Sequence, residues 1–185
     1  MARVSTYLNF RRTTEQAFDF YRSVFGGDFI GPVQRFGDMS CSPDQPPPMT
    51  DADKTLILHI ELAILGGQVP MGTDASESMG FTLTEGNNVH INLEPDTRAE
   101  TDRLFHALSA GGKVDMPLKE MFRGDYFGSV TDRFGLHWML NCSRESSGGN
   151  LGEPIRPTAL AEPDLERYTI RLPVRVIGSG GGINE

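Results

Sequence analysis

The stretch TTEQAFDFYRSVFGGDF at residues 13–29 recurs in outline as RAETDRLFHALSAGGKV at residues 98–114. From residue 13 to residue 98 the offset is 85 residues, and it stays constant through both stretches. The matching positions are Glu15 and Glu100, Phe20 and Phe105, and Gly26-Gly27 and Gly111-Gly112. An internal match in this order indicates a duplicated structural unit.

Both stretches have the periodicity of an amphipathic helix. The apolar positions that share one helical stripe are Ala17, Phe20, Tyr21 and Val24 in the first stretch and Leu104, Phe105 and Leu108 in the second. Each stretch reaches Gly-Gly, the residue type that best accepts the left-handed conformation at a helix C-terminus. The sequence therefore predicts two equivalent helices.

Short segments of alternating apolar and polar residues flank each helix. VSTYLNF precedes the first helix, and FIGPVQRF, KTLILHIELAIL and QVPMG follow it. NVHINLEP precedes the second helix, and KVDMPLKEMF, YFGSVTD and LHWMLNC follow it. The pattern predicts an α+β fold over residues 1–142, with two β-α-β-β-β modules in series at about 1–74 and 80–142. Each module would place its helix on one face of a curved sheet.

A C-terminal extension follows the predicted modules. Residues 143–166 contain three prolines and are interpreted as a linker. Residues 167–177 alternate well and predict a docked strand, and it must be an edge strand because Pro173 has no N–H to donate. Residues 178–185 are Gly-rich and predict a flexible tail.

Composition limits the partners and the location. The net charge is −8, and no Lys/Arg cluster stands out, so neither nucleic acid nor an anionic membrane surface is an expected partner. No apolar run approaches the roughly 20 residues of a membrane-spanning helix, and the N-terminus lacks the apolar segment of a signal peptide. The two cysteines, Cys41 and Cys142, form no metal-binding spacing. We expect a cytoplasmic protein with reduced thiols.

The central strands each have one apolar face and one polar face. The polar faces carry Ser5, Tyr7 and Asn9; His59 and Glu61; His90 and Asn92; and His137, Met139 and Asn141. Three of the four histidines and an acid fall on these faces, whereas ordinary solvent faces favour Lys, Glu, Arg and Thr. We interpret the polar faces as the lining of a concave cup. The alternative is a sheet whose polar face simply meets water.

Four motifs carry a resemblance to a known family: EQAFDFYRSVFGGDF, HIELAILGGQVPMGTD, GGKVDMPL and YFGSVTDRFGLHWMLNC. Together they span roughly residues 4–142, and they resemble the vicinal oxygen chelate superfamily of the glyoxalase and bleomycin-resistance fold. The nearest branch is the PhnB-like one, described as 3-demethylubiquinone-9 3-methyltransferase-like. The resemblance implies paired modules that form a cup, completed by a homodimer. Methyl transfer is not expected, because no Gly-rich S-adenosylmethionine loop follows a strand and opens a helix.

The resemblance also implies positions for a metal. These positions correspond to Ser5 (or Thr6), Glu61, His90 and Met139. Glu61 and His90 are good ligands for a divalent metal, but serine is a poor ligand and the Met139 thioether is too soft for the usual metals. We therefore expect no cofactor; the alternative is a divalent metal on the incomplete pair, with His59 as a substitute ligand.

Three functions remain open. The favoured one is a binding protein that holds a small organic ligand in the cup. Its predicted ligand-binding residues are Ser5, Tyr7, Asn92, Phe122, Tyr126, His137, Trp138, Met139 and Asn141. The alternatives are a metal-assisted lyase, isomerase or dioxygenase and a metal-independent enzyme that acts on a small carbonyl or phenolic compound. The metal-independent enzyme would use Glu61 with His90, or with His59, as an acid–base pair.

Overall fold

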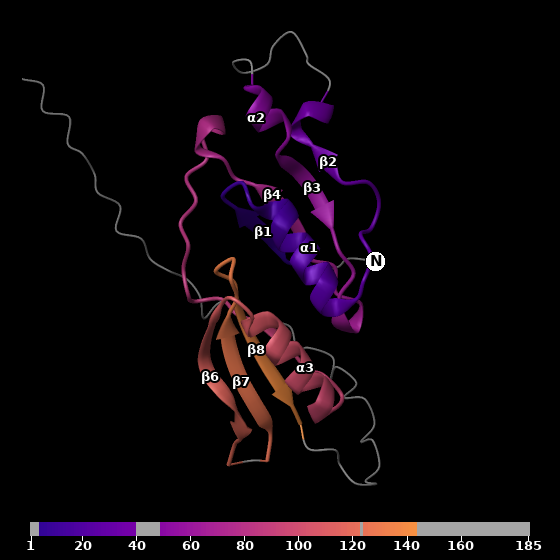
Figure 1. Ribbon diagram of the computed structural model, residues 1–185, viewed down its shortest axis with the longest axis vertical. Coiled ribbons are helices and arrows are strands. Elements are labelled where there is room, and N and C mark those ends of the chain that lie inside the picture. Colours follow the sequence, from indigo (N-terminus) through magenta and orange to yellow (C-terminus); the bar gives the residue numbers. More distant parts are fainter. Residues whose placement is uncertain (1–3, 40–48, 123, 144–185) are drawn as a thin grey trace, which may run out of the picture. The chain divides into compact units, whose positions relative to one another are not determined.

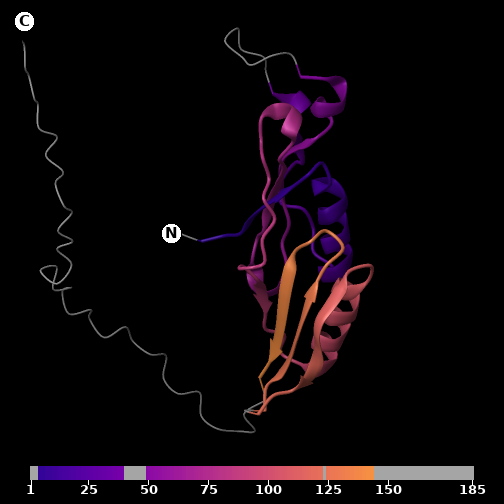
Figure 2. The same ribbon diagram turned by 90° about the vertical axis from the view of Figure 1, so that its left-hand side faces the viewer.

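The computed structural model describes residues 4–39, 49–122 and 124–143 (Figures 1 and 2). The predicted linker beyond residue 143, the predicted edge strand at 167–177 and the predicted tail at 178–185 lie outside these residues, as does Cys41. Within the described ranges no helix is both long and apolar enough to cross a membrane.

The first module is a four-stranded sheet covered by one helix (Figure 1). Its elements are β1 (Tyr7–Phe10), α1 (Thr14–Phe25), β2 (Gln34–Arg35), β3 (Ile57–Glu61) and β4 (Met71–Asp74). The strand order is β1-β4-β3-β2, with β1 parallel to β4 and the other pairs antiparallel. Short helical segments connect them: η1 (Phe36–Asp38), α2 (Asp51–Lys54), η2 (Leu65–Gly67) and η3 (Glu77–Met79).

The second module repeats this plan. Its elements are β5 (Ile91–Leu93), α3 (Arg98–Ser109), β6 (Lys113–Glu120), β7 (Tyr126–Thr131) and β8 (His137–Cys142). The strand order is β5-β8-β7-β6, again with the first strand parallel to the last. Both the predicted α+β class and the two β-α-β-β-β modules are confirmed.

Several strands are shorter than their alternating patterns. The segment FIGPVQRF forms only the two-residue β2, with Phe29 making a single bridge to Leu62. Gly31 has a positive φ of 72° and Pro32 has no N–H, so the backbone cannot continue a ladder there. Similarly, KTLILHIELAIL is a strand only over β3.

The Gly-Gly pairs end the two helices differently. Gly26 is the left-handed C-cap of α1, with φ of 70°, and its N–H donates to the carbonyl of Arg22, as the sequence predicts. In contrast, α3 ends at Ser109 with an extended C-cap at Ala110, and the positive φ of 77° falls at Gly111. The second Gly-Gly pair therefore turns the chain just after the helix instead of capping it.

In each module a phenylalanine of the helix packs directly against a glycine of the sheet. A Cβ added to Gly72 of β4 would overlap the ring of Phe18 from α1. A Cβ added to Gly128 of β7 would lie 2.8 Å from Cε2 of Phe105 from α3. The buried core of both modules is built around these contacts and includes Leu8, Phe10, Ile57, Ile60, Leu93, Leu104, Val130 and Leu140.

A buried carboxylate joins the two modules. Asp132, at the end of β7, accepts hydrogen bonds at Oδ2 from the hydroxyl of Tyr21 in α1 (2.8 Å) and from Nε1 of Trp138 in β8 (2.8 Å). Its Oδ1 accepts the backbone N–H groups of Phe134 (2.8 Å) and Leu136 (3.1 Å). Burial, followed by the charge of Asp132, raises the pKa of Tyr21 far above its ordinary value, so this hydroxyl remains a donor.

Candidate functional site

The polar face of the first module carries a short chain of hydrogen-bonded side chains. His59 and Glu61 alternate onto the same face of β3, and His59 Nε2 lies 2.9 Å from Glu61 Oε1. The hydroxyl of Tyr7 lies 3.4 Å from His59 Nδ1. Tyr7 reaches this position because β1 and β3 both pair with β4, where Met71 is the partner of Tyr7 and of Glu61. Both ring nitrogens of His59 are thus occupied.

The polar face of the second module is set by the register of its strands. His137, Met139 and Asn141 are half-buried, and the residues between them on β8 are buried, as their alternation predicts. Asn92 of β5 pairs with Met139 across the parallel ladder. His90 directly precedes β5, and its ring centroid lies 5.2 Å from that of His137.

A threonine and an aspartate that the sequence analysis did not select complete this face. Thr131 pairs with His137 across the β7–β8 ladder, and its Oγ1 lies 2.9 Å from His137 Nδ1. The same oxygen lies 2.6 Å from Oδ2 of Asp115, on β6, and Lys113 Nζ lies 2.9 Å from Asp115 Oδ1. The hydrogen bond from Thr131, followed by that from Lys113, lowers the pKa of Asp115.

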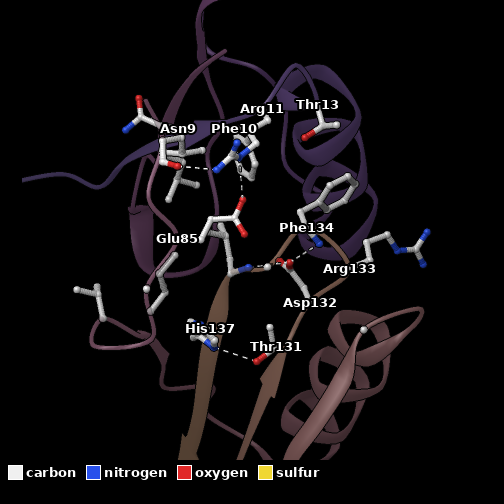
Figure 3. Close-up of a pocket in the computed structure, with 18 of the residues that line it drawn as sticks. Asn9, Phe10, Arg11, Thr13, Glu85, Thr131, Asp132, Arg133, Phe134 and His137 are labelled. Carbon is white, nitrogen blue, oxygen red and sulfur yellow. Dashed lines mark hydrogen bonds and ion pairs between the residues drawn. The ribbon is translucent and has the colours of Figure 1, made fainter. Parts of the chain in front are cut away.

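A cleft of about 950 Å³ lies beside this face (Figure 3). Its lining includes Tyr7 and Asn9 of β1, the polar pair Thr131 and His137, and apolar side chains such as Phe134. Figure 3 shows His137 and Thr131 joined by their hydrogen bond, with Asn9, Arg11 and Glu85 at a distance from them.

One wall of the cleft comes from the segment that connects the two modules. Arg11 holds this segment, because its Nη2 donates to the carbonyl of Leu83 (2.6 Å) and its Nε lies 3.6 Å from Glu85 Oε1. The β7–β8 turn forms another part of the lining, and the carboxylate of Asp132 fixes this turn through its bonds to two backbone N–H groups. A smaller cavity of about 570 Å³ is lined by His90 and Asn92.

The aromatic residues that were predicted to contact a ligand do not lie on one common surface. Trp138 is only 1% exposed and donates to Asp132, so its indole is part of the core and does not fit a ligand-binding role. Tyr126 is turned toward α3, where its hydroxyl donates to Asp102 Oδ1 (2.7 Å). Phe122 lies in the β6–β7 turn, away from the lining of both cavities. Tyr7 is the member of this group that lines the cleft.

The remaining predicted residues are divided between the two modules. Ser5 is half-buried ahead of β1, and Met139 and Asn141 share the polar face of β8 with His137. Glu61 is bonded to His59 in the first module, whereas His90 lies against His137 in the second. Among the residues that the structure describes, no three His, Cys, Asp or Glu side chains are close enough to hold a metal ion. The residues present therefore do not fit the metal set that the resemblance implied.

Comparison with known protein families shows to which family the chain belongs. A family model described as 3-demethylubiquinone-9 3-methyltransferase matches residues 2–141. The chain belongs to this family. It is also 30% identical over 151 residues to Protein YjdN of Escherichia coli strain K12, a match that covers 77% of this chain and 96% of that protein. The C-terminal extension lies beyond the end of the family match.

Solved structures agree with this assignment. PA1353 from Pseudomonas aeruginosa is 34% identical with a TM-score of 0.64, over 77% of this chain and 98% of that one. A putative 3-demethylubiquinone-9 3-methyltransferase, PhnB protein, from Bacillus cereus is 24% identical with a TM-score of 0.59, over 77% and 100%. A glyoxalase/bleomycin resistance protein/dioxygenase family enzyme from Burkholderia phytofirmans PsJN is 19% identical with a TM-score of 0.51, over 75% and 98%, and shares the fold. The glyoxalase-like fold and the vicinal oxygen chelate resemblance are thereby confirmed.

Proposed function

We propose that this protein binds a small organic ligand in the cleft lined by Tyr7, Asn9 and His137. The observation that carries the proposal is the cleft itself, whose volume of about 950 Å³ suits a small-molecule site. Its walls combine apolar side chains with a few polar groups, which is the usual composition of such sites. The Asn9 amide, the Tyr7 hydroxyl and the His137 imidazole suit a ligand that carries oxygen atoms, such as a carbonyl or phenolic compound.

Ligand screening by NMR would test this proposal. Small carbonyl and phenolic compounds would be titrated into the ¹⁵N-labelled full chain, and amide shifts should move at residues that line the cleft. Asn9→Trp should fill part of the cleft and abolish these shifts, because Asn9 is an exposed lining residue. The matched control is Gln34→Trp on β2, which is outside the cleft lining and should leave binding intact. If the ligand still causes these amide shifts in Asn9→Trp, it does not bind in this cleft.

A second candidate is acid–base catalysis without a metal on a small carbonyl or phenolic compound. The observation that favours it is the contact of 2.9 Å between His59 Nε2 and Glu61 Oε1 on a half-exposed face. The carboxylate orients the imidazole, as in many general acid–base pairs. This pairing uses His59, not His90, as the partner of Glu61. Loss of turnover in both Glu61→Gln and His59→Gln, with the fold intact by circular dichroism, would support this candidate once a substrate is known.

We also propose that a second copy of the chain covers the polar faces. Tyr7 is 47% exposed and Val89 is 70% exposed, and both line the cleft. Apolar surface of this kind is commonly covered by a partner. Sedimentation equilibrium should therefore give a homodimer at micromolar concentration. A single species of 20.4 kDa would contradict the proposal.

A further inference from the structure

The hydroxyl of Thr131 lies between a carboxylate and an imidazole. Its Oγ1 is 2.6 Å from Asp115 Oδ2 and 2.9 Å from His137 Nδ1. A threonine hydroxyl has one proton to donate, so it can donate to only one of these two neighbours. An ionised carboxylate can only accept, and the proton of Thr131 therefore belongs to the bond with Asp115.

The ionised state of Asp115 follows from its surroundings. Lys113 forms an ion pair with Asp115 Oδ1 at 2.9 Å, and the pKa of this carboxyl is held below its ordinary value. With its proton donated to Asp115, Thr131 Oγ1 must accept from His137. Nδ1 of His137 is then the protonated nitrogen, and neutral His137 has its lone pair on Nε2.

We propose that Thr131 and Asp115 are positioning residues that hold neutral His137 as the Nδ1–H tautomer, so that Nε2 accepts the hydroxyl of a phenolic or enolic ligand in the cleft. The ligand part of this inference rests on the proposed binding function, because it names the ligand chemistry of the same cleft. Within the described part of the chain, Nε2 of His137 makes no hydrogen bond, and His137 lines the cleft. A ligand hydroxyl is the complementary donor.

His59 provides an internal reference for this assignment. Its Nε2 faces the carboxylate of Glu61 and its Nδ1 faces the Tyr7 hydroxyl, so the same reasoning gives the opposite Nε2–H tautomer. Neutral histidine in water also favours Nε2–H. The Nδ1–H form at His137 is thus a signature that a merely exposed histidine would not give.

Long-range ¹H–¹⁵N NMR of the full chain, without ligand and at a pH where the histidines are neutral, tests the positioning. In the wild type, Nδ1 of His137 should have a pyrrole-type shift and Nε2 a pyridine-type shift, with the reverse at His59. Thr131→Val should return His137 to the Nε2–H form, whereas Thr131→Ser keeps the hydroxyl and should restore the Nδ1–H form. The matched control is Thr73→Val on the polar face of β4, which should leave His137 unchanged. An Nε2–H tautomer in the wild type would overturn the inference.

Titration with phenol, which keeps its hydroxyl proton at this pH, then tests the ligand chemistry with the same signals. We expect the His137 Nε2 shift to move on binding in the wild type and in Thr131→Ser, and binding to weaken about tenfold in Thr131→Val, the loss of one hydrogen bond of about 1.4 kcal/mol. Binding of equal affinity in Thr131→Val would overturn the role of the tautomer while leaving the proposed cleft function intact. If the Nδ1–H tautomer is present but neither phenol nor any other small compound shifts the cleft residues, the proposed function and the ligand part of the inference fail, and the positioning part stands.

Discussion

The two modules share a strand order and a helix position, but their polar faces present histidine in different ways. In the first module the acid is Glu61, two positions from His59 on the same strand, and the two side chains are in direct contact. In the second module the acid is Asp115 on β6, and it reaches His137 of β8 only through the hydroxyl of Thr131 on β7. A duplicated backbone can therefore hold one imidazole with contacts at both ring nitrogens and another whose Nε2 makes no hydrogen bond to any residue that the structure describes.

The buried carboxylates of the modules differ in a similar way. Asp74, at the end of β4, accepts from the N–H and hydroxyl of Thr14 (3.0 and 2.7 Å) and from the N–H of Ile57 (2.8 Å), all within the first module. Asp132, at the end of β7, accepts from groups of both modules. The second carboxylate thus stabilises the junction as well as its own turn.

The largest effect should come from breaking this junction. Asp132→Ala leaves four donors without their acceptor, two of them on buried side chains. We expect a loss of about 3 kcal/mol or more in the free energy of unfolding, measured by urea denaturation. Tyr21→Phe removes one donor to the charged group and should cost about 1.5–3 kcal/mol.

Asp19→Ala is the control for this prediction, because Asp19 is exposed on α1. It should change the free energy of unfolding by no more than about 0.5 kcal/mol. If Asp132→Ala has no larger effect than Asp19→Ala, the carboxylate does not hold the junction.

The next largest effect on stability should come from the two contacts between helix and sheet, which can be compared directly. Gly72→Ala places a methyl group where it overlaps the Phe18 ring, and we expect a loss of about 1–3 kcal/mol from overpacking. In Gly128→Ala the added carbon would lie 2.8 Å from Phe105 Cε2 and 3.0 Å from Leu118 Cδ2, so the cost should be smaller. Thermal melts of both variants would check the order, and a more stable Gly72→Ala protein would show that α1 adjusts freely.

Alkaline pH should weaken the junction selectively. The pKa of Tyr21 is raised in the folded state. The stabilisation that the protonated Tyr21 hydroxyl provides is therefore complete below its unfolded pKa of about 10 and decreases above that value. Above pH 10, the free energy of unfolding should fall more steeply in the wild type than in Tyr21→Phe. The difference between the two slopes should be up to about 1.4 kcal/mol per pH unit. Parallel pH profiles of the two proteins would contradict this assignment.

Truncation after Ser147 should have a smaller effect. We propose that the extension adds a strand at residues 168–176 to a sheet edge, because its alternate positions carry five apolar side chains. Burying five large side chains at about 1.5–3 kcal/mol each is nearly balanced by the cost of ordering nine residues at about 1–2 kcal/mol each. The melting temperature should drop slightly; an unchanged melting temperature and an unchanged dimer would show that the strand is not docked.

Metal removal should have the smallest effect. Because Glu61 and His90 belong to different polar faces, we expect no stoichiometric metal after purification and no change in melting temperature with EDTA. Elemental analysis that finds about one equivalent of divalent metal, lost in Glu61→Ala, would contradict this expectation and support a metal-assisted reaction.

The sequence determined much of what lies along single strands. Alternation is a property of the extended backbone, so the shared face of His59 and Glu61 and the shared face of His137, Met139 and Asn141 could be predicted. The same alternation already placed Trp138 on the apolar face. The structure shows that both modules bury this side chain, so it is part of the core. Aromatic character alone did not reveal which rings face a cavity.

By itself, the sequence determined the duplicated β-α-β-β-β plan, because a fixed offset between two amphipathic helices and the parity of strands are local features of the chain. Only the tertiary structure decided which polar groups meet. The bond from Tyr21 to Asp132 spans 111 residues, and Asp115 meets Thr131 only through the register of β6 on β7. Strand register, bulges and module packing depend on contacts between distant segments, so the partners of His137 could not be read from spacing along the chain.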